Sequence, residues 1–199
     1  MKLHISPGNI KTGAIPSFSL PSGKTCSREA CATCHVQGCY AAKLERLRPN
    51  VRNAYADNLR LVQEDLDGVR CKLNAFFDHP KAPRFFRIHV SGDFFSTAYL
   101  EMWLDVVRSH PNTKFLAFTK QFEIVSPYLD NLPGNLSLVA SGWPGVPIPQ
   151  QILDALPVAW MQDGTENRIP PDAVECSGGC DACGFCWATR RQHVFFHKH

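Results

Sequence analysis

The amino-acid sequence predicts an α/β protein, built as a small or incomplete TIM-like (β/α) barrel with cysteine-rich N- and C-terminal segments. Two observations predict this fold: short β-rich runs alternate with amphipathic helical runs from residue 84 onward, and the β-rich runs end in polar residues. Such alternation is typical of parallel strands joined by right-handed crossovers. An open, doubly wound sheet is the alternative architecture. The length of 199 residues predicts a single domain, 1–199, that is large enough to bury a core.

The first half of the chain is predicted to be helical after an irregular, proline-rich start. The run 14–20 is compatible with one short strand, which Pro16 restricts to the edge of a sheet. Apolar residues then recur at three- and four-residue steps over 44–66, which is the stripe of an amphipathic helix. Pro49 interrupts this stripe and is expected to open a second helix. A further helix is predicted near 68–78.

The β-rich runs of the second half are predicted strands, at 84–90, 114–118, 136–140, 158–161 and 194–196. Helical runs lie between them at 96–109, 122–129 and 150–156. Parallel strands bring their carboxyl ends to one edge of the sheet, where ligands bind in such folds. We therefore expect a polar site at this edge, with the cysteine-rich C-terminal segment beside it. The residues that end the strands are Ser91, Asp93, Thr119, Lys120, Ser141, Gln162 and Asp163.

Composition and charge place the chain among proteins of a reducing compartment without membrane spans. No apolar run approaches the roughly 18 residues that a membrane-spanning helix needs. The first residues lack the apolar core of a secretion signal, so a cytoplasmic location is expected. Nine cysteines without such a signal favour metal ligation over a disulfide framework. The formal charge of +3 permits a phosphate-bearing partner but does not predict one.

The densest functional signal is a group of four cysteines near the C-terminus, Cys176, Cys180, Cys183 and Cys186. Their spacing, C-x3-C-x2-C-x2-C, reverses the order of a bacterial ferredoxin run. Clustered thiolates are soft ligands that suit an iron–sulfur cluster or zinc. A structural zinc site more often has two well-separated C-x2-C pairs. The pattern therefore favours a [4Fe-4S] cluster over zinc. We expect Cys180, Cys183 and Cys186 to be ligands, with the fourth ligand supplied by Cys176 or from elsewhere.

A second, looser group of cysteines lies near the N-terminus, at Cys26, Cys31, Cys34 and Cys39. This group is a candidate source of the remaining ligand for the C-terminal cluster, or it holds a second metal. The alternative is that some of its members are small buried apolar residues. The spacing alone does not choose between these interpretations.

The strand end at 89–93 carries the residues most suited to catalysis. On a continuing strand His89 and Ser91 would point to the same side. A serine nucleophile needs such a base, with backbone N–H groups for an oxyanion. Asp93 and Lys120 complete the candidate catalytic set, in which Lys120 would hold a carboxylate or phosphate or lower a neighbouring pKa. The alternative is a strand-end serine, an aspartate that caps the next helix and a surface lysine.

Several motifs together resemble a phage and prophage protein family catalogued as gene product 88, over nearly the whole chain. The motifs are Gly8-Asn9, Ile15-Pro-Ser-Phe-Ser-Leu-Pro21, Thr25-Cys26, Cys39-Tyr-Ala41, Phe86-Arg-Ile-His-Val-Ser-Gly-Asp-Phe94, Phe115-Leu-Ala-Phe-Thr-Lys120, Cys180-Asp-Ala-Cys-Gly-Phe-Cys186 and Lys198-His199. The resemblance implies a [4Fe-4S] protein on a TIM-barrel-like scaffold in a bacterial or phage-infected cell, and hydrolysis of small esters.

The resemblance also implies which residues serve the family's functions. Its sulfurs correspond to Cys26, Cys39, Cys176, Cys180, Cys183 and Cys186, while Ser91 and Asp93 stand in the matching strand-end motif. Two cysteines depart from the pattern, because Cys31 is additional and the gap before Cys39 leaves Cys34 unassigned as a ligand.

Three functions follow as hypotheses. The first is an iron–sulfur ester hydrolase that acts on small, acetyl-type esters at the carboxyl edge of the strands. The second is a radical-SAM-like redox enzyme, because the first three C-terminal cysteines also have the spacing of that cluster, although they lie unusually late in the chain. The third is a non-enzymatic, metal-stabilised phage protein that binds nucleic acid. Its support is a row of basic residues in the predicted helices: Lys43, Arg46, Arg48, Arg52 and Arg60.

Overall fold

The computed structural model describes residues 2–35, 38–188 and 192–197 of the chain. These residues form one eight-stranded sheet of order β1-β2-β3-β4-β5-β6-β8-β7. Strands β1 and β2 are antiparallel, and every other neighbouring pair is parallel. The strands are β1 Ile5–Ser6, β2 Ser17–Phe18, β3 Phe85–Ile88, β4 Lys114–Thr119, β5 Leu136–Gly142, β6 Val158–Gln162, β7 Val174–Glu175 and β8 Val194–His197.

The sheet is open within the described part of the chain, because β1 and β7 stand at its two ends and do not pair with each other. The α/β class is therefore confirmed, and a closed barrel is not formed. Each predicted strand is present, with ends shifted by a few residues. The edge position expected for the strand near Pro16 is wrong, because β2 pairs with β1 on one side and β3 on the other; Pro16 itself precedes the strand. The two strands that the sequence did not predict, β1 and β7, have two residues each, which is too short to show a period of two.

The helices follow the predicted order. Pro49 opens the second of two consecutive helices, and the helix predicted at 96–109 begins after Ser96, whose side chain accepts a hydrogen bond from Tyr99 N at 3.3 Å. The helices are α1 Arg28–Ala30, α2 Tyr40–Leu47, α3 Pro49–Glu64, α4 Leu66–Phe77, α5 Thr97–Ser109, α6 Phe122–Val125, α7 Gln150–Ala155, α8 Cys180–Cys183 and α9 Phe185–Ala188, with a π-helical turn at Cys31–His35 and a 3-10 helix at Ser126–Asn131. In the described residues, no helix is both long and apolar enough to cross a membrane.

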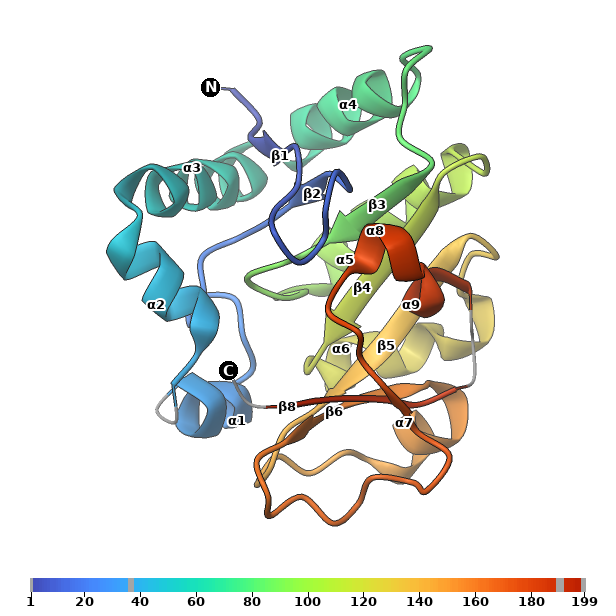
Figure 1. Cartoon of the computed structure of the whole chain (residues 1–199). Helices are drawn as coiled ribbons and strands as arrows, with labels where there is room; N and C mark the ends of the chain where they lie inside the picture. Colours follow the sequence, from blue (N-terminus) through green and yellow to red (C-terminus); the bar gives the residue numbers. More distant parts are fainter. Residues whose placement is uncertain (1, 36–37, 189–191, 198–199) are drawn as a thin grey trace.

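The two faces of the sheet are covered differently. Phe86 of β3 and Phe115 of β4 belong to the main core, where they meet Phe77 of α4 and Trp103 of α5. Their neighbours along the strands point to the other face, where Leu116 and residues of β5 and β6 pack against α9. In Figure 1, α8 and α9 lie in front of β3, β4 and β5, and α5 and α6 lie behind the sheet.

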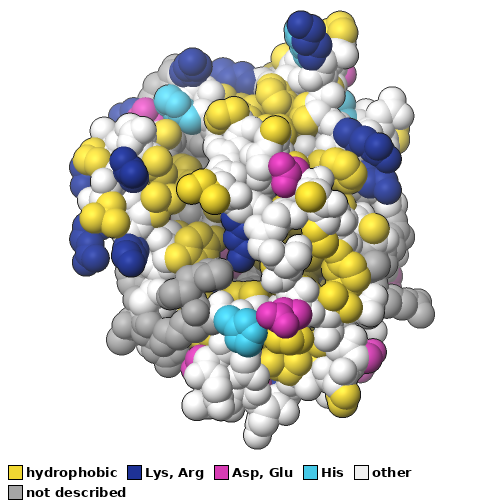
Figure 2. Space-filling view, in the orientation of Figure 1, with side chains coloured by type: hydrophobic (Ala, Val, Ile, Leu, Met, Phe, Trp, Pro, Cys, Tyr) yellow, Lys and Arg dark blue, Asp and Glu magenta, His cyan; other side chains and the backbone are white. Residues whose placement is uncertain are grey.

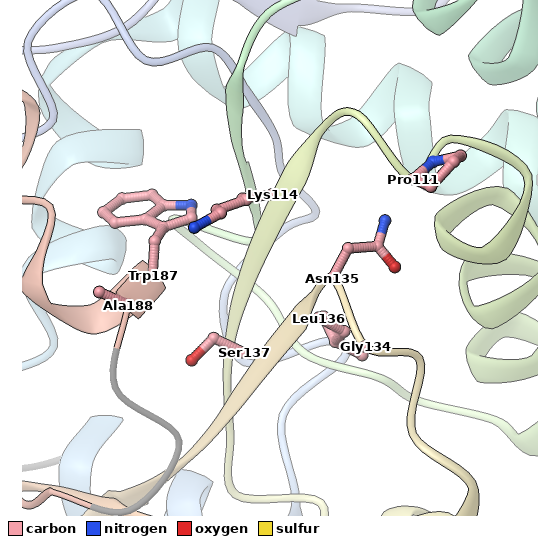
Figure 3. A pocket seen from close by; sticks show the side chains of 8 residues that line it. All are labelled: Pro111, Lys114, Gly134, Asn135, Leu136, Ser137, Trp187 and Ala188. Atoms are coloured by element: carbon pink, nitrogen blue, oxygen red, sulfur yellow. The ribbon is translucent and has the colours of Figure 1, made fainter.

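The C-terminal cysteines lie in the crossover that leads from β7 through α8 and α9 to β8, which pairs with both β6 and β7. Trp187 of α9 anchors this crossover, since its indole N–H donates to the Phe86 carbonyl at 3.3 Å and its ring meets Phe85 edge-on at 5.8 Å. Figure 3 shows the ring beside Lys114, the first residue of β4. The crossover thus runs over the face of the sheet toward the amino ends of the strands. The sequence placed the cysteine-rich segment at the carboxyl ends of the strands. Of its four cysteines, Cys176 directly follows the end of a strand, β7.

Candidate metal centre and strand-end site

All four C-terminal cysteines, Cys176, Cys180, Cys183 and Cys186, line one pocket on the face of the sheet opposite α5. Backbone hydrogen bonds hold the pocket, from Cys176 N to the Phe195 carbonyl at 2.8 Å and from Cys180 N to the Lys11 carbonyl at 2.9 Å. Gly184, in the left-handed conformation at φ 60°, ends α8 and allows the chain to turn at once into α9. Cys176 therefore lines the same pocket as the three cysteines that the sequence named as ligands, and whether they bind a metal stays a prediction.

The surroundings of the pocket favour the neutral form of two of its thiols, those of Cys180 and Cys186. Burial, together with the neighbouring cysteines, raises the pKa of Cys186 to about 11. The same causes raise the pKa of Cys180. Arg87 of β3 acts in the opposite direction on both thiols. Because metals bind thiolates, ligation here would release protons, as is usual for cysteine sites.

The donor set fits an iron–sulfur cluster. Four thiols surround one pocket with apolar walls that include Phe185, Trp187 and Val194, and soft sulfur donors suit Fe–S clusters. Among the described side chains, no group of three or more His, Cys, Asp and Glu is arranged so that it could hold a metal ion.

The N-terminal cysteines lie beside the strand-end residues. Burial, together with Asp93, Cys31 and Cys39, raises the pKa of Cys26 to about 11, although a hydrogen bond with the Gly23 backbone acts in the opposite direction. A hydrogen bond with Cys39 and burial raise the pKa of Cys34, whereas Lys120 lowers it. The Cys31 thiol donates to the Gly23 carbonyl at 3.3 Å. The structure therefore places Cys176 in the C-terminal pocket and brings Cys26 and Cys34 next to Asp93 and Lys120 instead.

His89 does not lie on the same side as Ser91, contrary to the sequence-based expectation. Strand β3 ends at Ile88, and His89 has φ +64°, which breaks the alternation of a strand. Its Nε2 lies 2.7 Å from the Tyr99 hydroxyl and its ring packs against Phe94, with centroids 4.9 Å apart. Burial lowers the pKa of His89 to about 3. The imidazole is therefore neutral and belongs to the core behind the sheet.

Ser91 is buried and ties α2 to the strand end. Its hydroxyl donates to Glu45 Oε1 at 3.1 Å, and the same carboxylate oxygen accepts from Ser22 N at 2.9 Å. The Ser91 carbonyl accepts from Leu20 N at 3.0 Å, and the side chain is 4% exposed. The hydroxyl of Tyr40 in α2 donates to the neighbouring Val90 carbonyl. These contacts give Ser91 a structural position.

Asp93 joins the ends of β3 and β4. Its Oδ1 accepts from Phe94 N and from the Thr119 hydroxyl, both at 2.8 Å, and its Oδ2 accepts from Lys120 N at 2.7 Å. Burial raises the pKa of Asp93 to about 6, although the hydrogen bonds from Lys120, Thr119 and Phe94 act in the opposite direction. The carboxyl group thus fixes the backbone from which the Lys120 side chain extends.

Lys120 and Ser141 form a partly exposed polar pair at the carboxyl edge of the strands. Lys120 Nζ donates to the Ser141 hydroxyl at 2.8 Å and lies 5.4 Å from the centre of the Trp143 ring. Both members of the pair are half-buried. Thr119 is opposite Ala140 in the register of β4 and β5, so the next residues along the two strands are neighbours. Sequence reasoning named both residues but did not pair them, because the register is not visible in the sequence.

A turn follows the end of β6, where the sequence placed Gln162 and Asp163 in the polar site. The Gln162 side chain donates to the Glu166 carbonyl at 3.1 Å, and Asp163 Oδ1 accepts from Thr165 N at 2.9 Å. Glu166 is buried and binds Arg168, whose guanidinium stacks over Trp160 at 5.0 Å. These residues stabilise the end of β6 and do not join the Lys120 pair in the contacts described here.

Substitution of Gly92 by alanine is expected to destabilise the strand end by about 3 kcal/mol, through left-handed strain and overpacking together. Gly92 has φ +82°, and a Cβ would lie 2.7 Å from both Leu20 Cβ and Thr25 Oγ1. Gly164→Ala is the matched control, with φ +95° and open space around the added carbon, and is expected to cost about 1 kcal/mol. Urea unfolding of both variants tests this. Equal losses would show that the close approach at Gly92 is unimportant.

Fold and site together define an α/β protein whose mostly parallel sheet carries a four-cysteine pocket on one face and a polar strand-end site. The family described as Gene product 88 matches residues 3–189, and the chain belongs to this family. Its curated relatives include the Gene 88 protein of Mycobacterium phage L5 and that of Mycobacterium phage D29. Each is 31% identical to this chain over 222 aligned residues, which cover 97% of this chain and 92% of the relative. No solved structure matches.

Proposed function

We propose that the protein is an iron–sulfur protein that holds a [4Fe-4S] cluster through Cys176, Cys180, Cys183 and Cys186. The observation that carries the proposal is the lining of one pocket by all four cysteines. No disulfide joins any of the nine cysteines, all of which lie in the described part of the chain, and this suits ligation in a reducing compartment. A bound cluster would supply one-electron redox chemistry or Lewis acidity at this face.

The gathering of four cysteines also bears on the radical-SAM alternative. Such an enzyme uses three cysteines and leaves one iron without a protein ligand. Here Cys186 lines the same pocket as the three cysteines of that spacing and is available as the fourth ligand. This favours a cluster whose irons are all ligated by the protein.

We infer ester hydrolysis at the carboxyl edge of the strands as the activity of the protein, with small, acetyl-type esters as substrates. The hydrogen-bonded pair of Lys120 and Ser141 favours this edge, because both side chains are half-buried and therefore within reach of a ligand. In parallel α/β folds this is the edge at which ligands bind. Figure 2 shows a hollow on the face that carries α8, with a Lys or Arg side chain at its floor.

The order of the strands in the sheet favours an architecture derived from a (β/α) barrel. Strands β2 to β6 are adjacent in sequence order, without the reversal of order that defines a doubly wound sheet. Helices α4 and α5, which connect them, lie together on one face of the sheet, as helices do on the outside of a barrel. We therefore infer that the open sheet is an incomplete barrel, with the cysteine-rich crossover on its inner face.

The nucleic-acid alternative rests on the basic side chains of α2 and α3. Figure 2 shows Lys and Arg side chains over these helices, and Lys43, Arg46, Arg48 and Arg52 are exposed. Arg60 is paired with Asp57 at 2.7 Å. Salt-dependent association with oligonucleotides would support this function, and its absence at low salt would remove it.

Iron, sulfide and zinc per chain, measured on anaerobically purified protein together with its visible spectrum, test the proposed cofactor. About four irons and four sulfides with a broad absorption near 400 nm are expected for one cubane cluster. One or two zinc ions in a colourless sample would contradict the proposal and would make the cysteines structural ligands.

A further inference from the structure

The strand-end edge contains two serines that differ in access and in partner. Ser91 is 4% exposed and donates to a carboxylate oxygen of Glu45. Ser141 is half-buried, and its hydroxyl oxygen lies 2.8 Å from Lys120 Nζ, an amine that can take a proton when it is neutral. A nucleophile must reach a substrate and must have a group that takes its proton. Within the described contacts, Ser141 combines both conditions.

The position of Lys120 is fixed from three sides. Its backbone N–H is bound by Asp93 Oδ2 at 2.7 Å, and the carboxyl of Asp93 is itself held by Thr119 and Phe94. Its Nζ lies over the Trp143 ring at 5.4 Å. Because β4 and β5 are in register here, the Lys120 side chain extends along the end of β5 toward Ser141. A catalytic pair held by such supports keeps its geometry without help from a substrate.

We propose that Ser141 is the nucleophile of the strand-end site and that Lys120 is the base that takes its proton. This inference rests on the proposed ester hydrolysis and replaces Ser91 as the candidate nucleophile. Serine–lysine pairs are a known variant of the serine–histidine arrangement. The half-exposed ring of Trp143 lies beside the pair and offers an apolar surface to a small acyl group.

The reaction balances with ester and water alone. The neutral amine of Lys120 takes the hydroxyl proton of Ser141 while Oγ bonds to the acyl carbon. The bond from this carbon to the alcohol oxygen then breaks, and the ammonium returns its proton to the departing alcohol. Water adds to the acyl-serine, gives a proton to the amine and releases the acid, after which the proton returns to Ser141.

The first test combines hydrolysis of p-nitrophenyl acetate with covalent labelling by a fluorophosphonate, with the labelled peptide located by mass spectrometry. The wild-type protein is expected to hydrolyse the ester and to carry the label on Ser141. Ser141→Ala is expected to lose at least about 100-fold in kcat/KM, the scale of losing an activated nucleophile, and to lose the label. Ser137→Ala is the matched control, since Ser137 lies on the same strand and its buried hydroxyl has no hydrogen-bond partner among the residues that the structure describes.

Two further variants separate the roles. Ser91→Ala is expected to keep the label, and Lys120→Arg, which keeps the charge but cannot serve as a base at neutral pH, is expected to lose both labelling and hydrolysis. An active Lys120→Arg variant would overturn the role of Lys120. Undiminished hydrolysis by Ser141→Ala would contradict the assignment of Ser141 as the nucleophile, while the proposal of ester hydrolysis would still hold. A wild-type protein that neither hydrolyses nor labels, with its metal content intact, would overturn both the hydrolysis and this inference.

Discussion

Replacement of Cys186 by alanine is expected to reduce bound iron from about four per chain to below about one and to remove the absorption near 400 nm. Cys186 lines the four-cysteine pocket and is surrounded by the other three cysteines. A cubane that lacks one of its cysteine ligands is exposed to water and loses iron. Iron analysis after desalting, with the visible spectrum, measures the effect.

Cys71→Ala is the matched control for this loss, because Cys71 is an exposed thiol on α4. It is expected to retain the full iron content. Cys26→Ala and Cys39→Ala test the other cysteine group, and both are expected to retain the C-terminal cluster, since Cys176 supplies the fourth thiol of its pocket. Full cluster occupancy in Cys186→Ala would refute the proposed ligand set. Loss of the cluster in Cys39→Ala but not in Cys176→Ala would move the fourth ligand to the N-terminal group.

Substitution of Asp93 by asparagine is expected to change the pH dependence of stability by about 3 kcal/mol. Burial raises the folded-state pKa of Asp93 from 3.8 to about 6. The folded protein therefore binds a proton between these values that the unfolded chain has already released. The contribution of this group is fully present below about pH 4, and it is lost as the pH rises through 6. Asparagine has a similar shape and does not titrate.

Urea unfolding of the wild-type protein and Asp93→Asn between pH 4 and pH 7 measures this difference. The free energy of unfolding of the wild-type protein should fall relative to that of the variant as the pH rises. Asp67→Asn is the control, because the Asp67 side chain is 86% exposed. A wild-type curve parallel to the Asp93→Asn curve would show that burial does not shift the titration of Asp93.

The sequence predicted those parts of the fold that repeat. Helices α3 and α5 carry apolar stripes long enough to define the helical period. Pro49 indicates the start of α3, because proline is favoured at the first position of a helix. The gathering of the C-terminal cysteines was predictable as well, because loops of two and three residues leave their thiols little freedom to separate. Strands of two residues, such as β7, carry no such signal.

The errors at the strand-end site have one local cause and two long-range causes. His89 was assigned to the side of Ser91 on the assumption that the strand continues, but a single left-handed residue turns it into the core. Amino-acid type alone does not predict that a histidine adopts the left-handed conformation, as His89 does at φ +64°. The pair of Lys120 and Ser141 depends on the register of two strands, and Glu45 reaches Ser91 from a helix 46 residues earlier in the chain. Such long-range contacts are set by packing and leave no pattern in either segment alone.

Because β8 lies between β6 and β7, the solubility of the protein is expected to depend on the fold of the cysteine-rich crossover. Strand β7 pairs with β8 and not with β6, so both strands depend on the fold of the segment between them. If the segment holds the proposed cluster, and oxidation removed that cluster and unfolded the segment, β6 would become an unprotected edge. Its residues, Val158–Gln162, are mostly apolar and buried. An exposed apolar edge recruits strands from other chains, so damage at the thiols would be expected to appear as insoluble protein.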